Sequence, residues 1–140
     1  MDWSGDVVYE ALGSYIDDLH GSVFIGTARG RVILYRNGTY NLTPAENPPF
    51  LNIFYRDGML CISGVWSEGK ETEAVMIRMV PSGVEVRDNV IYLTFKPRKG
   101  GIVMVALYGN EGLAKTLESV VSECREYREN ERIISSRVSR

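Results

Sequence analysis

The ten residues ILYRNGTYNL (Ile33–Leu42) and, twenty positions later, IFYRDGMLCI (Ile53–Ile62) follow one pattern. Each has an apolar residue, any residue, Tyr, Arg and then Asn-Gly or Asp-Gly, and each ends on an aliphatic residue. Asn-Gly and Asp-Gly between alternating apolar runs favour type I′ turns, in which both central residues have positive φ. The chain therefore predicts two β-hairpins.

A two-residue turn also fixes which residues face each other across a hairpin. The expected pairs are Arg36–Thr39, Tyr35–Tyr40 and Ile33–Leu42 in the first hairpin, and Arg56–Met59, Tyr55–Leu60 and Ile53–Ile62 in the second. This register places Ile33, Tyr35 and Leu42 on one face of the first hairpin. In the second, it predicts a more polar face with Asn52, Phe54 and Arg56, and an apolar face with Leu51, Ile53 and Tyr55.

The rest of the central region also alternates as strands do. Further strands are predicted over residues 23–27, 31–36, 74–80, 84–87, 90–96 and 102–108. We expect turns at Ala28-Arg29-Gly30 and at Asp88-Asn89. Residues 44–49 contain three prolines and are predicted to be a loop, because proline has no N–H to donate to a ladder. A charged loop is expected over residues 67–72.

Helical spacing occurs at both ends of the chain. Over Asp6–Leu19, the apolar stripe consists of Val8, Leu12, Tyr15, Ile16 and Leu19. After a cap at Asn110, the second stripe consists of Leu113, Leu117, Val120, Val121, Cys124 and Tyr127. We expect the second helix to pack on the sheet or on a copy of itself.

Strands grouped between two helices predict the α+β class. The expected architecture is an antiparallel meander or barrel-like sheet of seven to eight strands with an N-terminal and a C-terminal helix. We predict one domain over residues 1–132 and a flexible basic tail over 133–140. Strands followed by one closing helix are also compatible with a pleckstrin-homology-like barrel, although no motif identifies that family.

The composition is that of a globular protein, with 140 residues of which 44% are hydrophobic. No apolar run approaches the roughly 18 residues of a membrane span, and the N-terminus is acidic, unlike a secretory signal. We therefore expect a cytoplasmic protein that does not enter a membrane. Cys61 and Cys124 lie far apart and outside any CxxC pattern, so we predict two buried thiols, no metal and no cofactor.

Catalytic motifs are absent from the sequence. It contains one histidine and lacks a Gly-x-Ser-x-Gly elbow, an HExxH motif and a nucleotide-binding glycine pattern. Asp17, Asp18 and His20 form the one cluster that resembles a catalytic or metal site. We interpret it as an ordinary solvated helix end, because the sequence offers no further ligand to complete a metal site. We predict a protein that is not an enzyme, because general acid–base chemistry near neutral pH needs a tuned base.

The net charge of −2 is unevenly distributed. Residues 1–20 carry five acids and no base, whereas residues 21–108 carry ten bases and seven acids. Twelve of the sixteen bases are arginine, whose planar guanidinium stacks on rings and binds phosphate in a bidentate manner. The predicted sheet is therefore the basic part of the protein.

Basic side chains interleaved with aromatic rings are typical of domains that bind single-stranded nucleic acid, where bases stack on the rings. The candidate binding residues are Arg29, Arg31, Arg36, Phe54, Arg56, Trp66, Arg87, Arg98 and Lys99. Further rings on the strands are Tyr35, Tyr40, Tyr55, Tyr92 and Phe95. Phe54 and Arg56 are the strongest pair, so replacing both by alanine is expected to weaken oligonucleotide binding.

A protein-interaction or oligomerisation module is the alternative. Strand edges, the C-terminal helix and the pair Ile133–Ile134 offer surfaces for a partner or for a homo-oligomer through that helix. The position of the arginines separates the two hypotheses. Arginines that converge on one groove favour phosphate, whereas arginines paired with the acids of the N-terminal helix are structural.

Overall fold

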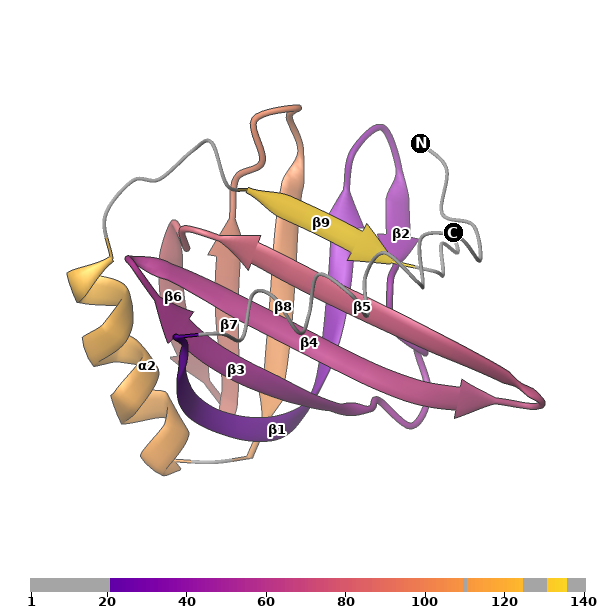
Figure 1. Ribbon diagram of the computed structural model, residues 1–140, viewed down its shortest axis with the longest axis horizontal. Coiled ribbons are helices and arrows are strands. Elements are labelled where there is room, and N and C mark those ends of the chain that lie inside the picture. The colour runs from indigo at the N-terminus through magenta and orange to yellow at the C-terminus, as the bar shows by residue number, and fades with distance from the viewer. Residues whose placement is uncertain (1–20, 110, 125–130, 136–140) are drawn as a thin grey trace.

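The computed structural model describes residues 21–109, 111–124 and 131–135 (Figure 1). These residues form nine strands and one helix. The strands are β1 (Val23–Tyr35), β2 (Thr39–Asn41), β3 (Phe50–Arg56), β4 (Met59–Glu68), β5 (Glu71–Met79), β6 (Gly83–Arg87), β7 (Val90–Phe95), β8 (Ile102–Tyr108) and β9 (Arg132–Ser135), and the helix is α2 (Glu111–Glu123). The α+β class and the C-terminal helix are confirmed. The predicted helix over Asp6–Leu19 lies outside the described residues.

All strand pairs are antiparallel, and the order is β6-β7-β8-β1-β3-β4-β5-β9, with β2 on the free side of β1. The sheet is open and does not have the barrel-like form that the sequence predicts, because β6 and β9 stand at its two ends and do not pair with each other in the described chain. β1 divides the strands into two parts. The first half of β1 pairs with β3. β4, β5 and β9 follow in that order beyond β3, and we call this part sheet A. The second half of β1 pairs with β8 on one side and with β2 on the other. β7 and β6 follow beyond β8, and we call this part sheet B.

The two sheets enclose one hydrophobic core. Figure 1 shows the strands of sheet A crossing obliquely over those of sheet B, with α2 at one side. The core contains Leu51, Ile53, Leu60, Ile62, Val75 and Ile77 from sheet A, and Val32, Leu34, Ile91, Leu93, Phe95, Val103, Val105 and Leu107 from sheet B. Helix α2 adds Leu113, Ala114 and Leu117 and packs on β1 and β6, so its apolar stripe is used within the fold. Because the inner faces share a core, the outer faces of the two sheets point away from each other.

The predicted turn at Ala28-Arg29-Gly30 is wrong, since β1 runs through these residues without interruption. Gly30 is the residue at which β1 changes partners, from β3 to β8. A Cβ at this position would lie 2.8 Å from the Ala106 carbonyl oxygen and 2.8 Å from a methyl of Leu51. Glycine is therefore required here for close approach of the two sheets, which is a different use from a turn.

The hairpin predictions hold at two of three turns. The register Arg56–Met59, Tyr55–Leu60 and Ile53–Ile62 is confirmed. Asp57 and Gly58 have φ of 49° and 80°, as a type I′ turn requires. Asp88 and Asn89 have φ of 51° and 64° in the turn between β6 and β7, as predicted.

The register of the first hairpin is shifted by one residue from the prediction. Tyr35 faces Thr39 and Leu34 faces Tyr40, so three residues form the loop. The shift places Leu42 on the face of Val32 and Leu34, where it is fully buried and donates its N–H to the Val32 carbonyl at 2.9 Å. Burial of Leu42 in the core favours this register, because a one-residue slip would move it to the outer face.

Two segments predicted to be irregular are extended. β4 extends to Glu68 and β5 begins at Glu71, so the loop expected over residues 67–72 is shorter than predicted. Ile133–Ser135, predicted as the start of the flexible tail, belong to β9 and pair with β5. The proline-rich segment 44–49 contains no strand, as predicted.

Candidate nucleic-acid interface

Seven of the nine predicted binding residues fall into three groups that do not share one groove. Arg31 and Arg87 lie on the outer face of sheet B, as does the ring of Tyr92. Arg36 contacts the loop that carries Arg98 and Lys99, at the end of the same sheet. Phe54 and Arg56 lie on the outer face of sheet A. The core separates this last group from the first.

The outer face of sheet B carries two stacked pairs of arginine and tyrosine. The guanidinium carbon of Arg87 lies 4.7 Å from the ring centroid of Tyr92, and that of Arg31 lies 6.0 Å from the centroid of Tyr108. Tyr92 faces Ala106, which faces Arg31, and Tyr108 faces Val90. This register makes the two tyrosines diagonal neighbours, about 7–8 Å apart at Cα.

We call this surface the sheet B face, and its members come from four strands. They are Arg31, Ile33 and Tyr35 of β1, Glu85 and Arg87 of β6, Tyr92 and Thr94 of β7, and Met104, Ala106 and Tyr108 of β8. Tyr35 is 37% exposed. Helix α2 packs into the core, so within the described residues no helix covers this face.

Arg31 has an unusual environment on this face. It is half-buried, and its Nε is buried without a hydrogen-bond partner in the described part of the chain. Arg87, by contrast, pairs through its Nε with a carboxylate oxygen of Glu85 at 3.1 Å. A partly desolvated guanidinium without a carboxylate favours binding of an external anion, because burial of a charge is costly unless the charge is paired.

The basic loop adjoins one end of the sheet B face. The Nε of Arg36 donates to the carbonyl of Gly100 at 3.0 Å, which ties the first hairpin to this loop. The backbone N–H of Arg98 donates to the carboxylate of Glu131 at 2.6 Å, and Lys99 is exposed. Arg36, Arg98 and Lys99 are therefore grouped in space although the first is more than 60 positions from the others in sequence.

The pair Phe54 and Arg56 shares one face, as the hairpin register predicts. Phe54 packs edge-on against Phe24, with centroids 5.4 Å apart. The Nε of Arg56 lies 3.5 Å from a carboxylate oxygen of Asp57 in the adjoining turn. The ring of Phe54 is therefore engaged with a neighbouring ring, and the charge of Arg56 is partly balanced.

The other two predicted binding residues, Arg29 and Trp66, and the further ring Phe95 have structural contacts. Arg29 stacks on Phe50 at 4.3 Å from the ring centroid and donates to the carbonyl of Pro48 at 3.0 Å. Trp66 packs against the core. Phe95 is fully buried inside the core and is not available for base stacking.

Tyr108 is the member of the sheet B face that sequence reasoning missed as a binding residue. The sequence predicts it only as the last residue of the strand over residues 102–108. All seven residues of this strand are apolar or aromatic, so no alternation in the sequence identifies Tyr108 as outward-facing. The structure buries Val103, Val105 and Leu107 and leaves Met104 and Tyr108 half-buried. An alternating strand in the middle of a sheet has one face in the core and one outside.

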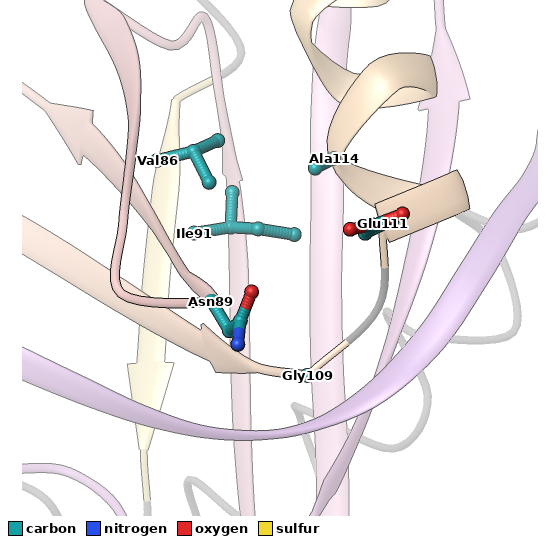
Figure 2. Close-up of a pocket in the computed structure, with 6 residues that line it drawn as sticks. All are labelled: Val86, Asn89, Ile91, Gly109, Glu111 and Ala114. Carbon is teal, nitrogen blue, oxygen red and sulfur yellow. The ribbon is translucent and has the colours of Figure 1, made fainter.

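A separate hollow lies where the β6–β7 turn meets the start of α2 (Figure 2). Val86, Ile91 and Ala114 form its apolar lining, and Asn89 and Glu111 form its polar rim. Its volume is about 350 Å³. β6 borders it as the last strand of sheet B, so a free strand edge and an apolar hollow adjoin.

The described residues contain neither a metal-binding group nor a membrane-spanning helix. Asp17, Asp18 and His20 lie outside the described residues, within which no group of three or more potential metal ligands occurs. In the same residues, no helix is long and apolar enough to cross a membrane. Both cysteines are free, Cys61 buried as predicted and Cys124 only half-buried.

Comparison with known proteins returned no matching family model, no similar curated protein and no similar solved structure.

Proposed function

We propose that this protein is a non-enzymatic binding domain for single-stranded RNA or DNA and that the sheet B face is its binding surface. The observation that carries the proposal is the pair of neighbouring stacks, Arg31 on Tyr108 and Arg87 on Tyr92. Proteins that bind single strands without sequence preference combine rings for base stacking with cations for the phosphates. The free cysteines agree with a cytoplasmic location, which is part of the proposal.

The charges of the sheet B face suit a polyanion. Among the residues that define this face, Arg31 and Arg87 are basic and Glu85 is the one acid. Arg36, Arg98 and Lys99 extend the basic surface beyond the end of the sheet. A strand of nucleic acid that crosses the two tyrosines would reach this loop, so phosphates would have cations at both ends of the stacking surface.

Two matched double variants test the position of the site. Arg31→Ala with Tyr92→Ala removes one cation and one ring from the sheet B face, and Phe54→Ala with Arg56→Ala removes the same groups from sheet A. We expect the first to weaken binding by roughly tenfold or more, since one stacked base contributes about 1–3 kcal/mol. The second is expected to change binding less than threefold, because its ring and its cation are already engaged.

Titrations of a labelled oligonucleotide with each variant distinguish the outcomes, after circular dichroism has shown that both are folded. Unchanged binding by the Arg31/Tyr92 variant would remove the sheet B face as the site. Loss of binding in the Phe54/Arg56 variant alone would place the site on sheet A, as the sequence suggests.

An extended peptide at the edge of β6 is the second candidate, favoured by the hollow beside that edge. β6 pairs only with β7 in the described chain, so its outer edge has no strand partner there and could accept an added strand. Val86 is 43% exposed and lines the hollow, which could receive one apolar side chain of the peptide. The pleckstrin-homology-like interpretation belongs to this candidate, but the open sheet does not support the barrel that it requires.

The peptide candidate predicts selective enrichment from a displayed library of linear peptides. The selected peptides should share an apolar residue, and Val86→Arg should reduce their binding at least tenfold while the Arg31/Tyr92 variant binds them normally. The reduction is expected because a charged side chain would fill an apolar hollow. A selection without a shared residue, or binding that survives Val86→Arg, would exclude the edge of β6.

A further inference from the structure

β6 is an edge strand that lacks the usual protections against pairing with another strand. It pairs with β7 alone among the described strands, and its register from Gly83 to Arg87 contains no bulge. Its sequence, GVEVR, has neither proline nor lysine, which natural edge strands often carry to prevent association. Val86 is 43% exposed, and the side chains of Glu85 and Arg87 are 63% and 60% exposed. This edge could therefore accept an added strand.

The backbone groups of two valines point to the free edge of β6. The β6–β7 turn has two residues, so the pair that flanks it, Arg87 and Val90, exchanges both of its backbone hydrogen bonds. Residues along a strand bond alternately to its two sides. Glu85 therefore also bonds to β7, whereas Val84 and Val86 direct their N–H and C=O groups away from it.

We propose that β6 pairs antiparallel with β6 of a second copy of this chain, about a twofold axis at Val86. A symmetric contact is self-complementary, so the position of its axis fixes every pair of residues across it. With the axis at Val86, Glu85 of each copy faces Arg87 of the other. Two ion pairs would therefore cross the contact, and this charge complementarity identifies a second copy as the occupant of the edge.

Other axes do not give this match. An axis at Glu85 would oppose two carboxylates, and an axis at Arg87 would oppose two guanidinium groups, which is unfavourable directly across strands. An axis at Val84 would leave Glu85 opposite Gly83 and Arg87 beyond the end of the strand. An axis between two residues would place outer-face side chains opposite inner-face ones. The sequence of β6 is thus self-complementary in one register.

Both faces of the strand contribute to this register. On the inner face, Val86 lines the hollow (Figure 2), and the two Val86 residues would lie beside it with Cα atoms about 5.5 Å apart. On the outer face, Glu85 and Arg87 of different copies would form non-hydrogen-bonded pairs, in which side chains approach most closely. Arg87 already contacts Glu85 of its own strand at 3.1 Å, so the four charges would alternate in one network.

Charge reversal tests the register by sedimentation velocity. Two five-residue strands bury less area than a stable dimer needs, so we expect a native dissociation constant of about 10–100 µM. Glu85→Arg would make both cross-strand pairs Arg–Arg, and Arg87→Glu would make both Glu–Glu. We expect each variant alone to dimerise more weakly by about tenfold or more.

An equimolar mixture of the two charge variants is the matched control. Each arginine of one copy then faces a glutamate of the other, so the mixture should dimerise with nearly native affinity. Neither strand regains its own Glu85–Arg87 ion pair in the mixture, so recovery reports the contact between copies. Circular dichroism first shows that both variants are folded.

Disulfide formation tests the position of the axis. In a Cys124→Ser background, where Cys61 stays buried, Val86→Cys places one thiol of each copy at the axis. A Cα separation of about 5.5 Å suits a disulfide, so we expect a covalent dimer under mild oxidation. Val84→Cys is the control, because its two thiols would lie about 13 Å apart along the strands and should not cross-link.

Each outcome has one meaning. A native protein that stays monomeric up to about 500 µM would overturn the proposal, and selection of peptides by that monomer would assign the edge to the peptide candidate. A dimer retained by both charge variants would place the contact on another surface. A mixture that stays monomeric, or equal cross-linking at Val84 and Val86, would overturn the register. None of these measurements contains a nucleic acid, so they are independent of the function proposed for the sheet B face.

Discussion

Replacing Phe95 with alanine is expected to lower the free energy of unfolding by about 3–5 kcal/mol, the range for aromatic truncations in cores. Phe95 is fully buried among core residues from both sheets. The alanine variant would lose the transfer free energy of the ring and leave a cavity that the surrounding strands can fill only in part.

Tyr92→Ala on the same strand is the matched control. Tyr92 is half-buried and lies on the outer face, so its truncation leaves no enclosed cavity, and we expect a smaller loss of stability than for Phe95→Ala. Denaturant unfolding measures both changes as shifts in midpoint at constant slope. Equal losses for the two variants would contradict the assignment of Phe95 to the core and Tyr92 to the surface.

Gly30→Ala is expected to destabilise the protein by about 1–3 kcal/mol, as overpacking of a core does, and Gly30→Val by more. A Cβ at residue 30 would lie 2.8 Å from a backbone oxygen of β8, which cannot move aside as a flexible side chain can. The clash would arise where β1 passes from sheet A to sheet B, so relief would require the sheets to separate.

Gly83→Val is the matched control for this second prediction. Gly83 also lies in a strand, but a Cβ there would meet no atom within 4 Å. A β-branched residue is favoured in strands, so we expect Gly83→Val to be neutral or slightly stabilising. If chemical denaturation gave similar losses at both glycines, close packing of the sheets at Gly30 would be excluded.

Local signals in the sequence were sufficient to predict the turns and most of the strands. Asp57-Gly58 and Asp88-Asn89 determine their hairpins through backbone conformations that few residues adopt, which is a property of the two residues themselves. The same reasoning gave the wrong register at Asn37-Gly38. There, burial of Leu42 depends on contacts with residues that are distant in sequence, and these contacts outweigh the preference of the turn.

The part played by Gly30 could not be predicted from its neighbours. A glycine between two strand-like runs usually indicates a turn or a bulge, and only the approach of Leu51 and Leu107 shows that it permits sheet packing. The candidate interface could likewise be predicted only within single hairpins. Pairing within the second hairpin correctly placed Phe54 and Arg56 on one face, but the relation of that face to Arg31 and Arg87 depends on the change of partner strand of β1 at Gly30.

The measurement that tests the central claim most directly is fluorescence anisotropy of a labelled mixed-sequence oligonucleotide, single- and double-stranded, titrated with the full-length protein at low and at physiological salt. The account predicts micromolar or tighter binding of the single strand at low salt and weaker binding as salt rises, because neutralised phosphates release counterions. Arg31→Ala should reduce the salt dependence. No binding of the single strand at low salt, or binding that is independent of salt, would contradict a nucleic-acid function for the sheet B face.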